Sequence, residues 1–366
     1  MSVNVKDIII IGAGLAGLTA AILLARKGRE VTLFEKKKFP FHRVCGEYIS
    51  NETKPFLERE NLLPSDIELP NITNFEFSDS KGKGFQIPLD LGGFGVSRYV
   101  LDRHLWDIAK KEGVNCHELT DVIKLEFKDQ TFELTLSDNS TLTAKHVLGA
   151  FGKKSRLDNI LSRSFLHAEA PYIGVKYHIK AKFPSDKVAL HNFNGGYCGV
   201  SSIESGKTNL CYLALRKDLK AQGSIRSMEE VLLFQNPHLK KLFQESEFLF
   251  DQPEVINAFT FASKEPIENH VLMIGDAAGL ITPLCGNGMS IAIRSGKMAA
   301  ESLLNFSDRS AIEKDFKTEW TKEFAFRLKA GRAIQRIFGN NLTSSLAAKM
   351  PFLGKMLMPL THGKTF

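Results

Sequence analysis

Cysteine and tryptophan are scarce in this chain of 366 residues, with five and two copies respectively. Five cysteines without short paired spacings exclude a disulfide framework and a zinc ribbon, and they favour free thiols in a reducing cytoplasm. The ten histidines include no pair four residues apart, so we expect no metal site. Charged residues make up 24% and hydrophobic residues 43% of the chain, which excludes collagen-like and wholly disordered proteins.

One uncharged run, residues 8–25, is just long enough to be mistaken for a membrane span or a signal peptide. No basic cluster precedes it, and no convincing cleavage site follows it. It also contains three glycines with the spacing of a phosphate-binding turn. We therefore interpret the run as a buried strand, a glycine turn and a helix.

The motif Gly12-x-Gly14-x-x-Gly17 carries the chemistry of that turn. The first glycine allows a tight turn, the second lets the backbone approach a pyrophosphate, and the third lets the helix pack closely on the strand. The N-terminus of the helix then presents N–H groups to the phosphates. Glu35, at the end of the next predicted strand, can accept hydrogen bonds from ribose hydroxyls. Together these features predict a βαβ unit that binds a dinucleotide.

A second motif lies about 260 residues farther along the chain. A predicted strand delivers an aspartate at its carboxyl end, where the carboxylate can bind a sugar-alcohol hydroxyl. The helix that follows can stabilise an anion at its N-terminus. A helix N-cap is the structural alternative for the aspartate. The motif comprises Gly275, Asp276, Pro283, Gly286, Gly288 and Met289.

The two motifs resemble the flavoprotein superfamily of para-hydroxybenzoate hydroxylase, which includes geranylgeranyl reductases and flavin-dependent halogenases. The resemblance implies an α/β fold in which a Rossmann-like FAD-binding domain, with a GxGxxG βαβ unit and a three-stranded meander, carries an inserted antiparallel-sheet substrate domain. We expect the FAD-binding domain at 1–70, 95–164 and 265–323, and the substrate domain at 71–94 and 165–264. A basic helical segment, 324–366, ends the chain.

The same resemblance implies which residues hold FAD. Arg98 opens a predicted helix and resembles the family arginine that reaches the cofactor. A salt bridge with Asp102, four residues on, is the alternative. The FAD contacts that we expect are Gly12, Gly14, Ala16, Gly17, Glu35, Lys36, Arg43, Arg98, Gly275, Asp276, Pro283, Gly286, Gly288 and Met289.

Two stretches resemble the reductase branch of the superfamily. One contains Cys45, near the basic Arg43, and the other contains Tyr197. These two side chains are our candidate catalytic groups, as acid or nucleophile and as hydrogen-bond donor. The alternative is that both are ordinary packing residues. Phe151 stands where many hydroxylases carry an aspartate, which puts direct reduction by NADH or NADPH in doubt, although either remains a candidate electron donor.

Three functions follow from an FAD site. The favoured one is a monooxygenase that acts through a flavin C4a-hydroperoxide on an apolar or aromatic small molecule, of polyketide or lipid type. The second is a reductase of carbon–carbon double bonds in an isoprenoid or polyketide. The third is a non-catalytic protein that binds flavin and lipid. The 27 phenylalanines suit an apolar pocket.

The net charge of +7 lies entirely in 324–366, which has seven basic residues and no acidic one. A basic amphipathic segment can lie on an anionic membrane. The alternative is that its apolar face packs on the FAD-binding domain. No nucleic-acid-binding motif accompanies the charge, so we expect a cytoplasmic enzyme with a small-molecule substrate, no nucleic-acid partner, and peripheral membrane contact as a hypothesis.

Overall fold

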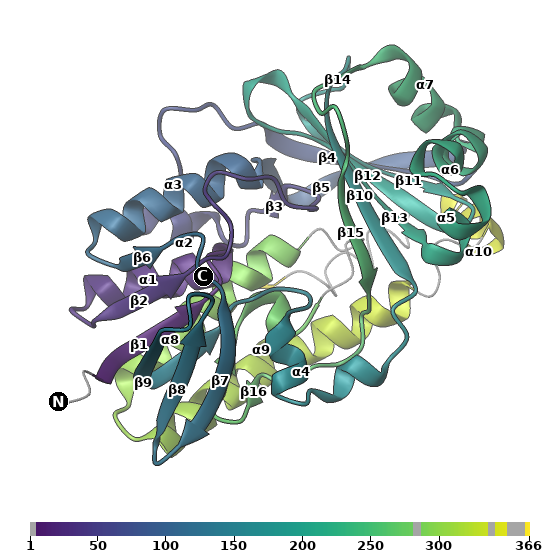
Figure 1. Ribbon diagram of the computed structural model, residues 1–366. Helices are drawn as coiled ribbons and strands as arrows, with labels where there is room; N and C mark the ends of the chain where they lie inside the picture. Colours follow the sequence, from purple (N-terminus) through teal and green to yellow (C-terminus); the bar gives the residue numbers. More distant parts are fainter. Residues whose placement is uncertain (1–4, 281–286, 336–340, 350–362) are drawn as a thin grey trace.

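The computed structural model describes residues 5–280, 287–335, 341–349 and 363–366. Two large sheets lie side by side, each covered by its own helices (Figure 1). The first sheet has the strand order β16-β17-β9-β1-β2-β6, with β7 and β8 joined through β9. The second has the order β14-β10-β13-β12-β11-β4-β5-β3, with β15 paired to β10.

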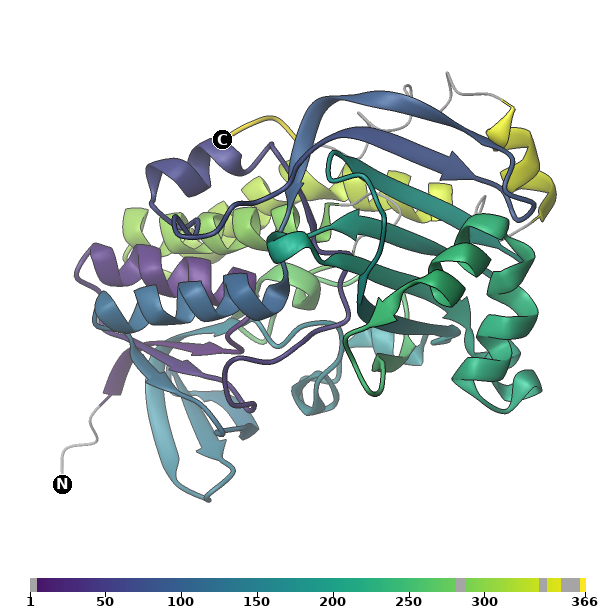
Figure 2. The same cartoon turned by 90° about the horizontal axis from the view of Figure 1, so that it is seen from above.

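Four consecutive buried isoleucines lie in β1, at the centre of the first sheet. This strand has parallel neighbours on both sides, and both faces of the sheet are covered there, so successive side chains are all apolar. Helices α1, α3 and α8 lie on one side of this sheet, and β7 and β8, which continue from β9 as a meander, lie on the other (Figure 2). The strands are β1 (Val5–Ile11), β2 (Val31–Phe34), β6 (Asn115–His117), β7 (Val122–Lys128), β8 (Thr131–Leu136), β9 (Thr141–Gly149), β16 (Ile267–Glu268) and β17 (Val271–Met273). The helices are α1 (Leu15–Arg26), α2 (Lys54–Arg59), α3 (Arg98–Lys111), α4 (Arg156–Ile160), α8 (Gly288–Asn305) and α9 (Arg309–Gln335).

The second sheet has two unlike faces because its side chains alternate. Its outer face packs Val175, Val200 and Leu210 against Met228 and Leu239 of the covering helices. The strands are β3 (Tyr48–Ser50), β4 (Asn71–Ser78), β5 (Gly84–Gly95), β10 (Tyr172–Lys180), β11 (Lys187–Phe193), β12 (Gly196–Ser202), β13 (Thr208–Leu215), β14 (Glu247–Phe248) and β15 (Glu254–Phe259). The helices are α5 (Arg216–Gln222), α6 (Ile225–Leu232), α7 (Pro237–Glu245) and α10 (Asn341–Ala348).

The expected fold class is confirmed: a βαβ unit with a glycine turn, a three-stranded meander and a helical C-terminal segment accompany a second, mostly antiparallel sheet. The pairing of β4 with β11 is parallel, so that sheet is mixed rather than purely antiparallel. The uncharged run 8–25 forms the end of β1, the turn and most of α1. In the part of the chain that the structure describes, no helix is long and apolar enough to cross a membrane.

Candidate functional site

The glycine turn between β1 and α1 leaves no room for a side chain at Gly12 or Gly17. Gly12 has φ +105°, and a Cβ added there would lie 2.4 Å from the carbonyl oxygen of Ala150. A Cβ at Gly17 would lie 2.1 Å from the carbonyl oxygen of Gly12. At Gly14 the nearest atom to an added Cβ is Nη2 of Arg98, at 3.4 Å. The bare backbone at the N-terminus of a helix fits the pyrophosphate of FAD.

Glu35 lies beside this turn, at the carboxyl end of β2, and its side chain is buried. One carboxylate oxygen accepts a hydrogen bond from the Ala13 N–H at 3.2 Å and another from Arg43 Nη2 at 3.1 Å. The other oxygen accepts from the Lys37 N–H at 3.1 Å. The carboxylate is therefore held in place beside the turn, and its contact with a ribose stays a prediction. Lys36, next to it, is exposed.

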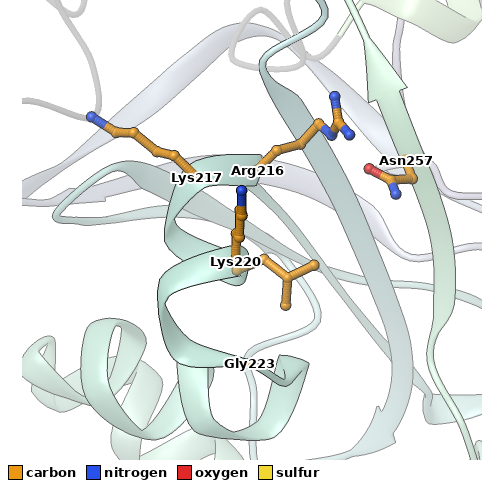
Figure 3. Close-up of a pocket in the computed structure, with 6 residues that line it drawn as sticks. Arg216, Lys217, Lys220, Gly223 and Asn257 are labelled. Carbon is orange, nitrogen blue, oxygen red and sulfur yellow. The ribbon is translucent and has the colours of Figure 1, made fainter.

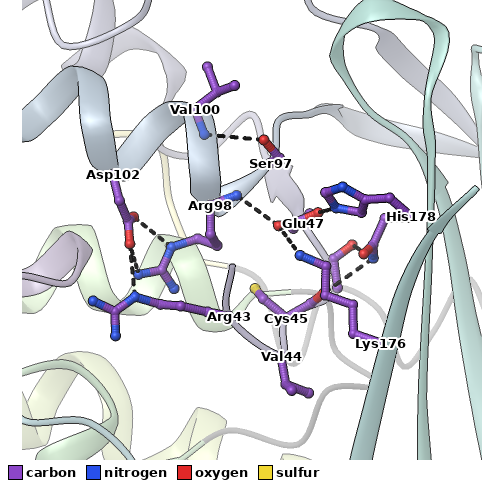
Figure 4. A network of polar contacts seen from close by, with 12 residues as sticks. Arg43, Val44, Cys45, Glu47, Ser97, Arg98, Val100, Asp102, Lys176 and His178 are labelled. Carbon is purple, nitrogen blue, oxygen red and sulfur yellow. Dashed lines mark hydrogen bonds and ion pairs between the residues drawn. The ribbon is translucent and has the colours of Figure 1, made fainter. Parts of the chain in front are cut away.

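Arg43 and Arg98 converge on Asp102, which is buried on α3 (Figure 4). Nε of Arg43 lies 3.0 Å from the Asp102 carboxylate, and Arg98 donates to it twice, at 2.7 and 2.8 Å. The salt bridge that was the alternative for Arg98 is thus present, and the same guanidinium also lies beside Gly14. Burial lowers the pKa of Arg98, but Asp102, and more weakly Cys45 and Asp276, outweigh it and raise that pKa.

Asp276 follows β17 in a short turn. The backbone carbonyls of this turn accept hydrogen bonds from side chains elsewhere in the chain. Lys264 Nζ donates to the Asp276 carbonyl at 2.8 Å, and Arg163 Nη1 donates to the Ala277 carbonyl at 2.9 Å. Burial lowers the pKa of Lys264 to about 8. The N-cap of α8 is Asn287, so Asp276 does not cap that helix, and its carboxylate stays partly exposed.

The middle of α8 packs closely against the start of α1, because small residues line the crossing of the two helices. A Cβ at Gly275 would lie 3.0 Å from Cβ of Ala16, and one at Gly296 would lie 2.3 Å from the Ala16 carbonyl oxygen. The first two residues of α8 are Gly288 and Met289. Pro283 and Gly286 lie outside the described residues.

Cys45 lies in a loop that runs between the two sheets (Figure 4). Asn209 on β13 donates to the Cys45 carbonyl at 3.2 Å, and Ser201 on β12 donates to the Gly46 carbonyl at 3.0 Å. The cysteine is a free thiol and is partly exposed. The loop is therefore attached to the inner face of the second sheet, the face opposite the covering helices.

Glu47, two residues after Cys45, forms a buried ionic cluster that sequence analysis missed. Lys176 Nζ lies 2.5 Å from one of its oxygens, and His178 Nε2 lies 2.6 Å from the other. Burial would raise the pKa of Glu47, but Lys176 and His178 outweigh it and hold that pKa below its usual value. The signal in the sequence was two basic side chains, two residues apart, on one face of an otherwise apolar strand.

Tyr197 lies farther along the same inner face, within a cluster of apolar side chains. Its hydroxyl donates to Oε1 of Gln335 on α9 at 3.1 Å. The structure therefore brings Tyr197 and Cys45 to one face of the sheet but sets them among different neighbours. The apolar cluster consists of Phe77, Leu190, Tyr197, Leu213, Phe259, Phe261 and Leu280.

A shallow basic hollow lies at the start of α5, lined by Arg216, Lys217, Lys220 and Asn257 (Figure 3). Helix α5 is far from the glycine turn in Figure 1, so this hollow is separate from the site described above. It holds exposed lysines and no buried polar side chain.

The nucleotide turn, the carboxylate beside it and the aspartate turn facing them define a flavoprotein-type site. The chain belongs to the family described as FAD binding domain, whose sequence profile matches residues 6–315. The predictions of FAD as cofactor and of an FAD-dependent oxidoreductase are therefore confirmed, as is the resemblance to the hydroxylase and reductase superfamily. The particular FAD contacts stay predictions.

Curated relatives are distant in sequence. Conditioned medium factor receptor 1 of Dictyostelium discoideum is 25% identical over 346 residues, which cover 86% of this chain and 66% of the receptor. Digeranylgeranylglycerophospholipid reductase 2 of Methanopyrus kandleri is 24% identical over 363 residues, which cover 93% of this chain and 89% of that protein. This chain thus spans slightly less than two thirds of the receptor and most of the reductase.

Solved structures share the whole fold. The flavin-dependent brominase Bmp2 matches with a TM-score of 0.79 and 19% identity, over 99% of this chain and 94% of that one. PqsL of Pseudomonas aeruginosa, solved in complex with 2-aminobenzoylacetate, matches with a TM-score of 0.71 and 19% identity, over 96% of this chain and all of the other. At this identity the likeness shows the fold alone.

Proposed function

We propose that this FAD-dependent oxidoreductase is a monooxygenase that acts on an apolar or aromatic small molecule. The observation that carries the proposal is the apolar cluster around Tyr197 and Phe261 on the inner face of the second sheet. Its member Leu280 directly follows the Gly275–Gly279 motif, so the cluster begins where an FAD motif ends. Apolar walls exclude water from a reacting centre, which oxygen chemistry requires.

The residues of the chain have separate roles in this proposal. FAD, when bound, supplies the electron transfer and the reaction with oxygen. Gly12, Gly14 and Glu35 hold the nucleotide half of the cofactor, and Asp276 binds its sugar-alcohol chain. Arg98, paired with Asp102, keeps a positive charge beside the glycine turn. The aromatic cluster orients the substrate and keeps water away.

A product profile under air and under nitrogen tests the proposal. We expect oxygen uptake that a candidate lipid or polyketide stimulates, and an oxygenated product that disappears without oxygen. In Phe261→Leu the KM for that substrate should rise about tenfold because an aromatic contact is lost. Phe248→Leu, on the opposite face of the sheet, is the matched control. Product formation that is unchanged under nitrogen would contradict the monooxygenase.

A second candidate is a reductase of carbon–carbon double bonds. Two observations favour it: a relative named as a digeranylgeranylglycerophospholipid reductase, and the attachment of the Cys45 loop to the second sheet. Cys45 would then donate the proton to the substrate. Cys45→Ala should lower turnover of an alkene by about 100-fold, yet it should change a monooxygenase reaction little. A matched control is Cys116→Ala on β6, outside this face.

NADH or NADPH is the electron donor that we propose. Phe151 follows Ala150, whose backbone lies against Gly12, so the departure from the hydroxylase motif is close to the nucleotide turn. Under nitrogen, NADH or NADPH should bleach the absorption of the bound flavin. If neither does, a separate reductase must supply the electrons.

The described part of the C-terminal segment also supports a membrane proposal, in which α10 brings the enzyme to an anionic lipid surface. Leu342 and Leu346, four residues apart on one helix, are 82% and 60% exposed. Vesicles that contain phosphatidylserine should sediment the full chain. The double variant Leu342→Ser, Leu346→Ser should stay in the supernatant, and cosedimentation equal to that of the unchanged chain would contradict the proposal.

A further inference from the structure

The loop that carries Cys45 is held by its backbone at four successive residues. Lys153 donates to the Val44 carbonyl at 3.2 Å, and Asn209 reaches the carbonyls of both Cys45 and Gly46. The Glu47 carbonyl accepts from an N–H that precedes α3, at 3.1 Å. Lys153 follows β9 of the first sheet, and Asn209 lies on β13 of the second. The donors therefore come from both halves of the molecule, the half built on the first sheet and the half built on the second. The position of Cys45 is therefore set by the tertiary structure rather than by the loop itself.

Glu47 has a backbone conformation that its own sequence does not favour. Its φ is +53°, in the left-handed region that glycine and asparagine adopt most readily. A non-glycine residue keeps such a conformation where the surrounding contacts impose it, and functional sites are where these residues gather.

The Glu47 carboxylate supplies those contacts from two directions. One oxygen accepts from the Arg98 N–H at 2.7 Å, at the first turn of α3, and also from Lys176. The other oxygen pairs with His178 on the same strand as Lys176. The side chain of Glu47 is fully buried, so these charges interact with little screening. Figure 4 shows Cys45 between Arg98 on one side and Lys176 on the other.

We propose that Glu47 is a positioning residue for the flavin reaction: by joining α3 to the second sheet it sets Cys45 and Arg98 in place at the boundary of the two halves. This inference rests on the proposed function, because it assumes that chemistry takes place at that boundary. Glu47 does not itself reach the reacting atoms. It acts through the loop on Cys45, and through the helix on the guanidinium beside Gly14.

The test compares Glu47→Gln with a matched control, Glu204→Gln. Glu204 is also buried and also binds the start of α3, through the N–H and hydroxyl of Ser97, but it does not touch the Cys45 loop.

The measurements are the FAD content, the rate at which iodoacetamide labels the Cys45 peptide, and kcat and KM. In Glu47→Gln we expect the labelling rate to change about fivefold or more. We expect kcat to fall about 100-fold at little change in KM, since a displacement of about 1 Å can have this effect. Glu204→Gln should keep the labelling rate within about twofold of the unchanged protein and should lower kcat much less than Glu47→Gln does.

The double variant Glu47→Gln, Lys176→Met separates a loss of positioning from a failure to fold. Removing both charges avoids an unpaired buried cation, so this protein should retain its stability. It should still show the altered labelling and the reduced kcat. Normal labelling and normal kcat in the double variant, or equal effects of Glu47→Gln and Glu204→Gln, would overturn the inference. Failure of the unchanged protein to oxidise NAD(P)H or to turn over any substrate would instead count against the proposed function, and the labelling comparison would still decide the role of Glu47.

Discussion

At the scale of single residues, the candidate site depends on positions where a side chain is missing. An added Cβ at Gly12 or Gly17 would collide with backbone atoms, so these glycines are needed for the fold as well as for the ligand. At Gly14 an added Cβ would meet Nη2 of Arg98 at 3.4 Å, which is a tight but tolerable contact. The three glycines of the motif therefore differ in what their replacement should do.

Gly14→Val should fold and lose FAD. The added methyl groups occupy the space that a pyrophosphate needs, while Gly14 itself has a negative φ, −86°, which valine can adopt. We expect the ratio of flavin to protein absorption to fall about tenfold or more in the purified variant. Gly223→Asn, in the left-handed turn after α5, is the control and should stay yellow. Retention of full FAD by Gly14→Val would contradict the assignment of this turn.

His191 should make the stability of the protein depend on pH. Burial, followed by the charge of His238, lowers the pKa of its imidazole to about 3. Below the ordinary histidine pKa of about 6.5, this side chain is protonated in the unfolded chain but stays neutral in the folded one. The folded state therefore loses stability as the pH falls from 6.5 towards 3. The loss is of the order of a few kcal/mol.

Urea unfolding at pH 7 and at pH 4.5 measures this effect. His191→Gln removes the titrating group beside Ser78, so the difference in unfolding free energy between the two pH values should shrink. An unchanged difference would show that other, partly buried histidines, such as His42 and His146, dominate the pH dependence. Burial lowers the pKa of each of these two to about 4.

At the scale of elements, the crossing of α1 and α8 brings two distant motifs together. The two helices can approach because Gly296 faces the backbone of Ala16. The crossing sets the distance between the glycine turn at the start of α1 and the first residues of α8, Gly288 and Met289. A change in the crossing should therefore alter stability and FAD affinity together.

Gly296→Ala should cost about 1–3 kcal/mol of unfolding free energy, because the new methyl group would lie 2.3 Å from the Ala16 carbonyl oxygen and the helices must separate. FAD should also bind more weakly, which a fluorescence titration of the apoprotein measures. Lys297→Ala, one residue farther on, removes only a surface ion pair with Glu301 and should change stability by less than about 0.5 kcal/mol. Equal effects of the two substitutions would contradict close packing at Gly296.

At the scale of the whole molecule, the basic C-terminal segment is partly built into the protein. Phe324 and Leu328 of α9 belong to the core of the first sheet. Arg327 is 5% exposed and pairs at 3.0 Å with Glu52, whose side chain is fully buried. One of the seven positive charges is thus compensated inside the fold. These contacts agree with the alternative in which the apolar face of the segment packs on the FAD-binding domain, at least for its first part. The membrane proposal depends instead on the exposed leucines of α10.

Arg327→Met should destabilise the protein by about 3–5 kcal/mol, since it leaves the buried carboxylate of Glu52 without this partner. Lys329→Met, two residues along the same helix, changes an exposed side chain and should have little effect. Thermal unfolding of both variants at pH 7 provides the comparison. A small effect of Arg327→Met would mean that α9 does not depend on this ion pair.

The sequence by itself determined the nucleotide-binding half of this protein. Gly12, Gly14, Gly17 and Glu35 lie within one βαβ unit, so local spacing and the alternation of buried strand and helix were enough to predict their arrangement. The meander was equally predictable, because its strands are neighbours in the chain and are joined by short turns. The aspartate motif could be recognised, although its approach to the turn depends on the α1–α8 crossing.

Only the tertiary structure decided what faces the glycine turn across the boundary of the two halves. Glu47, Lys176 and His178 come from segments about 130 residues apart, and they meet because β10 turns its polar face towards the loop. No local pattern encodes such a contact, since the free energy that holds three buried polar side chains together exists only after the surrounding chain has excluded water. The same is true of Tyr197, whose neighbours on the inner face and on α9 are brought to it by the packing of the two sheets.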